Sequence, residues 1–203
     1  MFELDHIVIT AEDPASAAKA FAAKYHVKTM EGGRHEKWGT YNHLANFAND
    51  CYIEWIGIFD ETTAANSDNP LIHQVSHALK QHLEGPVQFA LRTQDMDHMV
   101  QHFQNSSIRF TGPIPGSRQK PDGSMLNWKM LFPEAESGVL PFLIEWGDGK
   151  NMPEDEQLIN QRSIASVTYP QNLEVFRQVF RGIQLENSHL HLTGDNKMDF
   201  SLE

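Results

Sequence analysis

The feature that most constrains the fold is an internal repeat with a period of about 80 residues. The segment LDHIVITAEDPASAAKAF at 4–21 returns as VQFALRTQDMDHMVQHF at 87–103. A second pair, YIEWIG at 52–57 and FLIEWG at 142–147, follows later in each copy. A duplicated unit that repeats polar residues at matched strand positions predicts a pseudo-symmetric cleft.

Each copy begins with apolar residues in strand-like alternation, followed by an acidic residue that starts a helix. At 3–10, Leu4, His6 and Val8 are expected on one face and Ile7 and Ile9 on the other. Asp13-Pro14 provides a helix N-cap followed by proline at the first helical position. The first copy is predicted to contain a helix at 15–25, strands at 27–30, 38–47 and 51–59, and turns at 32–33 and 49–50. The second is predicted to contain strands at 87–92, 108–110, 124–132 and 140–146, a helix at 95–104, and a Gly/Pro-rich binding loop at 111–124.

The repeat divides the chain into two full units and a shorter third one. The sequence predicts an α+β fold in which two βαβββ modules form a curved mixed sheet around a cleft. The expected boundaries are 1–60 for the first module, 61–85 for a linker with a connecting helix, 86–150 for the second module and 160–203 for a partial third βαββ module. In the third copy Asn172 lies eight residues before Phe180, and Ala165 stands where His6 and Gln88 stand. This copy is expected to have lost the site and to act as a cap or as a contact between subunits.

Charge and composition exclude several classes of protein. The formal net charge is −11, and phosphate recognition requires a basic surface, so a nucleic-acid binder or a protein docking on anionic lipid is not expected. No apolar run approaches the roughly 20 residues of a membrane span, and the N-terminal segment is acidic where a signal peptide is basic. Cys51 is the single cysteine, which fits a reducing compartment. The sequence therefore predicts a cytoplasmic protein and leaves open whether the protein forms a homodimer.

Four polar residues occupy matched slots of the repeat. His6 and Glu54 stand at these positions in the predicted strands of the first module, and Gln88 and Glu145 in those of the second. A carboxylate among apolar strand residues is unfavourable unless it is paired or bound to a metal. One imidazole, two carboxylates and an amide oxygen suit a divalent cation with open water positions. The alternatives are a histidine that is only hydrogen-bonded and glutamates that reach solvent at a strand edge.

A second cluster, GGRHEKWGTYNHL at 32–44, offers side chains for a ligand. Arg34 and His35 are hypothesised to meet an anionic or carbonyl group, and Asn42 to hydrogen-bond the substrate. Arg92 and Arg118 would add a charge clamp, and Trp128 an aromatic wall. The alternatives are a polar loop leading into a strand, and a tryptophan that belongs to the core. Cys51 is expected on the face opposite Glu54, where it is not a nucleophile.

These segments resemble the vicinal oxygen chelate superfamily, most closely its glyoxalase-like branch of glyoxalases, bleomycin-resistance proteins and dioxygenases. The matching stretches are LDHIVIT, GGRH, GTYNHL, YIEWIG, FALRT, PDGSMLNWKMLFP and PFLIEW. By position, the resemblance implies His6, Glu54, Gln88 and Glu145 as ligands of Zn, Ni, Mn or Fe. It also implies a Lewis-acid metal, with Glu145 or Glu54 as the proton-transferring base.

The resemblance implies a small oxygenated molecule as the ligand, and lyase, isomerase or dioxygenase chemistry. The sequence departs from the family pattern at Gln88, because metal-dependent glyoxalases usually have a stronger metal ligand at that position. The alternative function is a metal-free protein of the same fold that binds or sequesters a small molecule, with His6, Arg34, Asn42 and Glu145 hydrogen-bonding the ligand.

Overall fold

The computed structural model of the protein describes residues 2–120, 123–136, 138–148, 151–182, 184–194 and 197–203. The first half contains β1 (Glu3–Thr10), α1 (Pro14–Tyr25), β2 (Met30–His35), the 3₁₀ helix η1 (Glu36–Trp38), β3 (Thr40–Phe47), β4 (Cys51–Ile58), α2 (Glu61–Ala65) and α3 (Pro70–Lys80). The second half contains β5 (Gly85–Arg92), α4 (Met96–Asn105), β6 (Phe110–Gln119), β7 (Met125–Ala135), β8 (Gly138–Val139) and β9 (Phe142–Trp146). The remainder contains η2 (Glu156–Leu158), β10 (Ile159–Asn160), β11 (Ile164–Pro170), α5 (Leu173–Phe180), β12 (His189–Thr193) and β13 (Asp199–Leu202).

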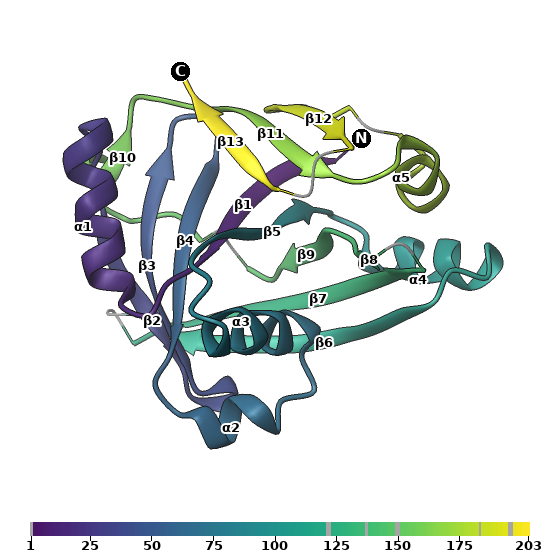
Figure 1. Ribbon diagram of the computed structural model, residues 1–203, viewed down its shortest axis with the longest axis horizontal. Coiled ribbons are helices and arrows are strands. Elements are labelled where there is room, and N and C mark those ends of the chain that lie inside the picture. The colour runs from purple at the N-terminus through teal and green to yellow at the C-terminus, as the bar shows by residue number, and fades with distance from the viewer. Residues whose placement is uncertain (1, 121–122, 137, 149–150, 183, 195–196) are drawn as a thin grey trace.

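A large open sheet curls through most of the molecule (Figure 1). Its strand order is β10-β3-β4-β1-β5-β9-β7-β6, with β2 beside β3 and β8 beside β7. β1 and β5 run antiparallel, and His6 lies opposite Ala90 just as Val8 lies opposite Gln88. This reciprocal pairing relates the two halves by a pseudo-two-fold axis between β1 and β5. The predicted α+β fold with a curved mixed sheet is confirmed.

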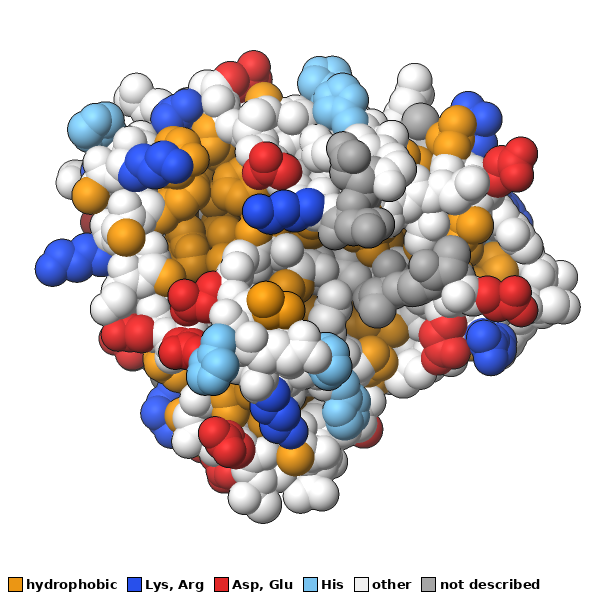
Figure 2. Space-filling view, viewed as in Figure 1, with side chains coloured by type: hydrophobic (Ala, Val, Ile, Leu, Met, Phe, Trp, Pro, Cys, Tyr) orange, Lys and Arg blue, Asp and Glu red, His pale blue; other side chains and the backbone are white. Residues whose placement is uncertain are grey.

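The C-terminal strands form a separate sheet of three strands, in the order β12-β11-β13. Ring contacts join this small sheet and α5 to the rest of the molecule: Phe89 to Tyr169 at 5.1 Å, Phe2 to Phe180 of α5 at 5.9 Å and Phe21 to Phe200 at 6.1 Å between centroids. Figure 2 shows hydrophobic side chains in the hollow between α1 and β13. The third unit therefore packs as a cap on the large sheet.

Helix capping explains why the repeated acidic or amide residue recurs in all three units. Asp13 accepts a hydrogen bond from the Ser16 backbone N–H at 3.1 Å, and Asp95 accepts one from His98 at 2.9 Å. Asn172 does the same at the start of α5. Such caps satisfy backbone donors that the first turn of a helix leaves free. The segment 61–85, predicted to be a linker with one connecting helix, contains α2 as well as α3, and Asp60 caps α2 in the same way.

Two predicted turns or loops are strands in the structure. The Gly/Pro-rich segment 111–124 is mostly part of β6, which ends at Gln119. β6 lies at the end of the sheet and pairs only with β7, and proline is tolerated on such an edge because one side needs no backbone donor. Gly32 and Gly33 lie within β2, at a shift of register between Glu31 and Arg34.

The large sheet separates two hydrophobic clusters. The outer core packs one face of the sheet against α1, α4 and the C-terminal unit, and Leu4, Ile7 and Trp55 belong to it. The inner core lies on the other face with α2 and α3, and Val8 and Ile56 belong to it. Among the described residues, none of the helices has the length and apolar character needed to span a lipid bilayer.

Candidate active site

A β-bulge in β1 positions the two polar residues that begin the site. The pairing with β5 passes from Leu4 opposite Leu91 to His6 opposite Ala90, which leaves Asp5 without a partner strand residue. A bulge redirects side chains, and here it brings the Asp5 carboxylate to 2.6 Å from His6 Nδ1. The same shift places Leu4 in the outer core. The alternation that predicted Leu4 on the face of His6 is therefore wrong.

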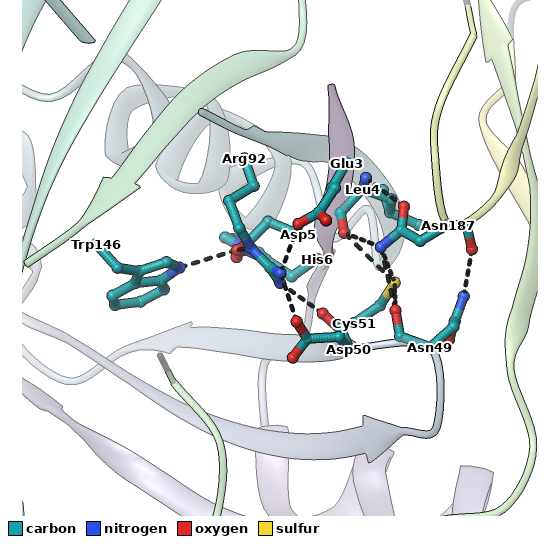
Figure 3. A network of polar contacts seen from close by, with 10 residues as sticks. All are labelled: Glu3, Leu4, Asp5, His6, Asn49, Asp50, Cys51, Arg92, Trp146 and Asn187. Carbon is teal, nitrogen blue, oxygen red and sulfur yellow. Dashed lines mark hydrogen bonds and ion pairs between the residues drawn. The ribbon is translucent and has the colours of Figure 1, made fainter. Parts of the chain in front are cut away.

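Asp5 is the centre of a buried polar network (Figure 3). Its Oδ2 accepts hydrogen bonds from Arg92 Nε at 2.7 Å and from Trp146 Nε1 at 2.8 Å. The Arg92 guanidinium also reaches Glu3 at 2.9 Å and Asp50 at 2.8 Å. Arg92 was predicted to bind substrate, but its donors are used to hold this network together.

The Asp5 carboxylate is fully buried and still ionised. Burial alone would raise the pKa of Asp5, but the hydrogen bond to His6 and the charges of His6 and Arg92 outweigh it and lower that pKa. The contact between the Asp5 carboxylate and His6 Nδ1 turns the other ring nitrogen, Nε2, towards Glu54. The orientation of the imidazole is thereby fixed before any ligand binds.

The lowered pKa of Asp5 predicts how stability depends on pH. Because this pKa is below its ordinary value of 3.8, ionised Asp5 stabilises the fold above that pH, and the contribution is lost as pH falls through the folded pKa. We expect Asp5→Asn to be less stable than the wild type at neutral pH, with the gap narrowing as the pH falls below the ordinary pKa of an aspartate towards the lower folded pKa. Urea unfolding across this range measures the gap. Asp97→Asn, at an exposed position of α4, is the control and should change stability little, whereas a gap that stays constant would contradict the prediction.

The Glu54 carboxylate lies beside the His6 ring and is oriented by the side-chain amide of Asn42. Its Oε2 is 3.5 Å from His6 Nε2, and its Oε1 accepts a hydrogen bond from Asn42 Nδ2 at 2.5 Å. Asn42 Oδ1 in turn accepts the Gly33 backbone N–H at 2.8 Å. A Cβ at Gly32 would lie 2.1 Å from Asn42 Oδ1, so only glycine leaves room for this amide. Gly32 therefore leaves space for the Asn42 amide that orients Glu54, and Gly33 donates a hydrogen bond to that amide.

These groups open into a small cavity of about 40 Å³. Six predicted site residues line it: His6, His35, Asn42, Glu54, Arg118 and Trp128. Aromatic rings form much of the wall, among them Trp38, Tyr52, Phe142 and Trp146. An apolar hollow with a few convergent polar groups is the usual setting for a small ligand. The structure thus brings together the predicted histidine, one carboxylate, the amide and one arginine in a largely aromatic chamber, called the inner cavity below.

His35 and Arg34, which were predicted to meet an anionic or carbonyl group, lie in different places: His35 lines the inner cavity, and Arg34 lies outside it. Burial lowers the pKa of His35, and the charge of Arg118 adds to this, so the imidazole is neutral at pH 7. Its Nδ1 lies 3.1 Å from Thr40 Oγ1. Arg34 is exposed, pairs with Glu36 at 3.0 Å and does not line the inner cavity.

Arg118 is the cation of the cavity wall. Its Nη2 donates to Asn151 Oδ1 at 2.7 Å and its Nη1 to the Gly32 carbonyl at 3.4 Å. Burial lowers its pKa, but a guanidinium remains charged at any physiological pH. Asn151 also bonds the Tyr52 hydroxyl, and the Tyr52 ring stacks on His6 at 4.5 Å between centroids.

Gln88 and Glu145 do not join the site. Gln88 Nε2 donates to the Leu140 carbonyl at 2.9 Å, and its side chain also bonds Tyr169. Glu145 accepts the Met96 backbone N–H at 2.8 Å, at the start of α4 on the outer side of the sheet. The predicted four-residue ligand set is therefore not assembled.

The strand register explains why Glu145 is misplaced. Val8 pairs with Glu54 in the first half, and its counterpart Ala90 pairs with Phe142 in the second. Phe142 therefore occupies the slot of Glu54, three residues before Glu145. An odd shift along a strand turns a side chain to the opposite face.

The donor set does not fit a chelated divalent metal. Of the expected ligands, only His6 and Glu54 face one another, since an aromatic ring fills the slot of the second carboxylate and the glutamine amide is bonded elsewhere. Within the part of the chain that the structure describes, no three His, Cys, Asp or Glu side chains are grouped to hold a metal ion. The thiol of Cys51 is buried in the outer core, and burial raises its pKa well above the ordinary value, as expected for a cysteine that is not a nucleophile.

Several residues of the site were missed from the sequence, among them Asp5, Tyr52 and Asn151. Asp5 was given no role, since strict alternation contains no bulge and turns it away from His6. Tyr52 was given no role either. Asn151 lies outside the repeat, in a segment with no periodic pattern, so no sequence signal marks it. Asp5 directly before His6 was the one available signal.

The sequence matches the profile of the glyoxalase-like domain family over residues 4–174. None of the curated proteins matches the chain. A hypothetical protein from Staphylococcus aureus superimposes with a TM-score of 0.76 at 19% identity, covering 95% of this chain and 85% of that one. This match leaves about ten of the 203 residues outside, so it extends well into the C-terminal unit at 160–203.

Two methylmalonyl-CoA epimerases have the same fold over a shorter length. The enzyme from Mycobacterium tuberculosis has a TM-score of 0.51 at 22% identity and covers 70% of this chain and 87% of its own. A variant of the enzyme from Streptomyces coelicolor, in complex with 2-nitronate-propionyl-CoA, has a TM-score of 0.55 at 20% identity and covers 75% of this chain and 100% of its own. By its sequence profile, which covers most of its length, the chain belongs to the glyoxalase-like domain family.

Proposed function

We propose that this protein binds a small oxygenated anion in the inner cavity and transfers a proton on it, with Glu54 and His6 as the reacting groups. The observation that carries the proposal is the buried polar line Asp5–His6–Glu54–Asn42 at one side of an otherwise aromatic chamber. Asp5 orients His6 and Asn42 orients Glu54, in both cases through a hydrogen bond. Such preorganisation is characteristic of general acid–base sites.

Unsatisfied donors favour a ligand rich in oxygen. Trp38 Nε1 and Asn69 Nδ2 are buried, and neither has a hydrogen-bond acceptor among the described residues. Both residues line the inner cavity, as does the Arg118 cation. Leaving a buried donor unpaired costs about 1–3 kcal/mol, so carbonyl or carboxylate oxygens of a ligand would be stabilised there.

The reaction that fits is an isomerisation next to a carbonyl group. Glu54 takes a proton from a ligand carbon, and the electron pair of that C–H bond moves into the carbonyl to form an enolate. The N–H donors and Arg118 stabilise the developing negative charge. Protonated Glu54 then returns a proton to the same carbon, or passes it through His6 Nε2 to a neighbouring atom. The solved relatives named as epimerases support this class, since epimerisation beside a carbonyl is a proton transfer.

Hydrogen–deuterium exchange tests the reaction directly. We expect the wild type to accelerate exchange of the C–H next to the carbonyl in D₂O for one or more of a panel of 2-oxo acids, 2-oxoaldehydes and methylmalonate, followed by proton NMR. Glu54→Gln should lower the rate by about 10²–10⁴-fold, the usual contribution of a general base. Arg34→Gln, outside the cavity, is the control. A Glu54→Gln rate equal to the wild type would overturn the proposal.

The same assay measures any need for metal. Because only two of the expected donors face one another, we expect the exchange rate to survive dialysis against EDTA. Loss of exchange that Zn²⁺, Ni²⁺, Mn²⁺ or Fe²⁺ restores would contradict this expectation and favour a metal-dependent lyase, isomerase or dioxygenase.

A second candidate function is metal-free binding without chemistry. It is favoured by the aromatic wall, in which Trp128 lies 6.1 Å from Trp38 and 5.5 Å from Trp146 between centroids. Such a chamber can hold a ligand by burial alone. Equal affinity of the wild type and Glu54→Gln, with no exchange in either, would support this second candidate.

A further inference from the structure

A second cavity adjoins the inner one, and Arg118 and Asn151 line both. This outer cavity has a volume of about 160 Å³. Its wall is largely apolar and includes Met30, Leu44, Met152, Pro153 and Leu158. Three exposed acidic residues, Glu31, Glu154 and Asp155, also line it. The outer cavity is thus an apolar space with a polar, solvent-facing margin.

The two cavities share one floor. Residues two apart on β3 lie on the same face of the sheet, and along this face Asn42 lines the inner cavity whereas Leu44 and Asn46 line the outer one. Residues two apart on a strand are separated by roughly 7 Å, which is the length of about five carbon–carbon bonds in a chain. The distance from the inner to the outer cavity along this face is therefore within the span of a single molecule of modest size, and Arg118 and Asn151 stand between the two spaces.

The boundary between the cavities contains a cation without a direct counter-ion. The Arg118 guanidinium bonds the neutral oxygens of Asn151 and Gly32, and no carboxylate of the described residues forms an ion pair with it. The charge of Glu54 acts on it only from across the inner cavity. A Cβ at Gly33 would lie 3.0 Å from Arg118 Cδ, so glycine there permits the close passage of this side chain. A half-buried cation held at the junction of two cavities is suited to an anionic group of a ligand.

We infer that the ligand spans both cavities: an oxygenated head beside Glu54 and His6, a carboxylate beside Arg118, and an apolar chain in the outer cavity. The inference deepens the proposed function and rests on it, because it assigns the three substituents of the reacting carbon. The carboxylate replaces Asn151 as the partner of the guanidinium. The apolar residues of the outer cavity set the length of the chain.

A series of 2-alkylmalonates tests this arrangement, because each carries two oxygenated groups and one alkyl chain on a single carbon. Titration calorimetry from methylmalonate to hexylmalonate should give an affinity that rises about fourfold per methylene group, the usual effect of burying a CH₂. Leu158→Trp fills the outer cavity and should abolish this rise while leaving methylmalonate affinity within about twofold. Leu83→Trp, at a position that is 57% exposed and lines neither cavity, is the matched control and should keep the rise.

Arg118→Met should weaken every member of the series by about tenfold or more, because the charge-assisted bonds are lost whatever the chain length. An affinity that does not change with chain length in the wild type would overturn the inference and leave the proposed function standing. Equal loss of short and long ligands in Leu158→Trp would also overturn it. Failure of every ligand to bind, together with no exchange in D₂O, would overturn the proposed function as well.

Discussion

Replacement of Arg92 by leucine should destabilise the protein by about 3–5 kcal/mol, the usual effect of removing one partner of a buried ion pair. Arg92 is 8% exposed, and without it the fully buried Asp5 loses its counter-charge while Glu3 and Asp50 lose a shared partner. Urea unfolding of both proteins at neutral pH measures the difference. The control is Arg34→Leu, whose exposed pair with Glu36 should contribute about 0–1 kcal/mol.

A double variant separates loss of charge compensation from loss of packing. If the unpaired Asp5 carboxylate causes the destabilisation, then Arg92→Leu combined with Asp5→Asn should recover part of the loss relative to Arg92→Leu alone. A double variant that is less stable by the full sum of the two single changes would show that the two residues contribute independently. The network would then be a set of separate contacts.

Replacement of Phe176 by alanine should cost about 3–5 kcal/mol and leave one cooperative transition. Phe176 is 1% exposed on α5 and belongs to the outer core with residues of the large sheet. Because the C-terminal sheet shares this core, its loss of packing should be felt by the whole molecule. Thermal and urea unfolding, followed by both circular dichroism and tryptophan fluorescence, measure the loss of stability and the number of transitions.

The matched control lies on the same helix. Leu173 is 37% exposed, so Leu173→Ala removes little buried surface and should cost less than about 1 kcal/mol. Two separate transitions, of which Phe176→Ala shifts only one, would mean that 160–203 folds as a unit of its own. That outcome would contradict a shared core.

The repeat predicted the order of strands and helices because each copy preserves its periodicity and its helix cap. It could not predict the slot of Glu145. The Glu-Trp pair recurs in both copies, yet Trp55 lies in the outer core and Trp146 lines the inner cavity. Local similarity contains no information on register, and a shift of three residues is enough to reverse the face.

The sequence predicted site residues whose position depends only on the alternation of their own strand. It did not predict those brought into the site by contacts between distant segments. His6, Glu54 and Asn42 could be chosen because alternation on regular strands gives the face of each. Asn151 reaches the cavity only through the fold, and its contact with Arg118 joins residues 33 positions apart. Proline and glycine in β6 suggested a loop, since the sequence does not reveal which strand will lie at the edge of the sheet.

Asp5, the extra residue in β1, orients the His6 ring but takes no part in the pairing that holds β1 in the sheet. Deleting Asp5 would leave Leu4 and His6 adjacent, and regular alternation would still turn them to opposite faces, as they are now. The strand could therefore keep its pairing and its leucine in the outer core, while the imidazole would lose its anchor and Arg92 one acceptor. Relatives with a strand one residue shorter could thus keep the fold, but they would need another group to fix the histidine ring.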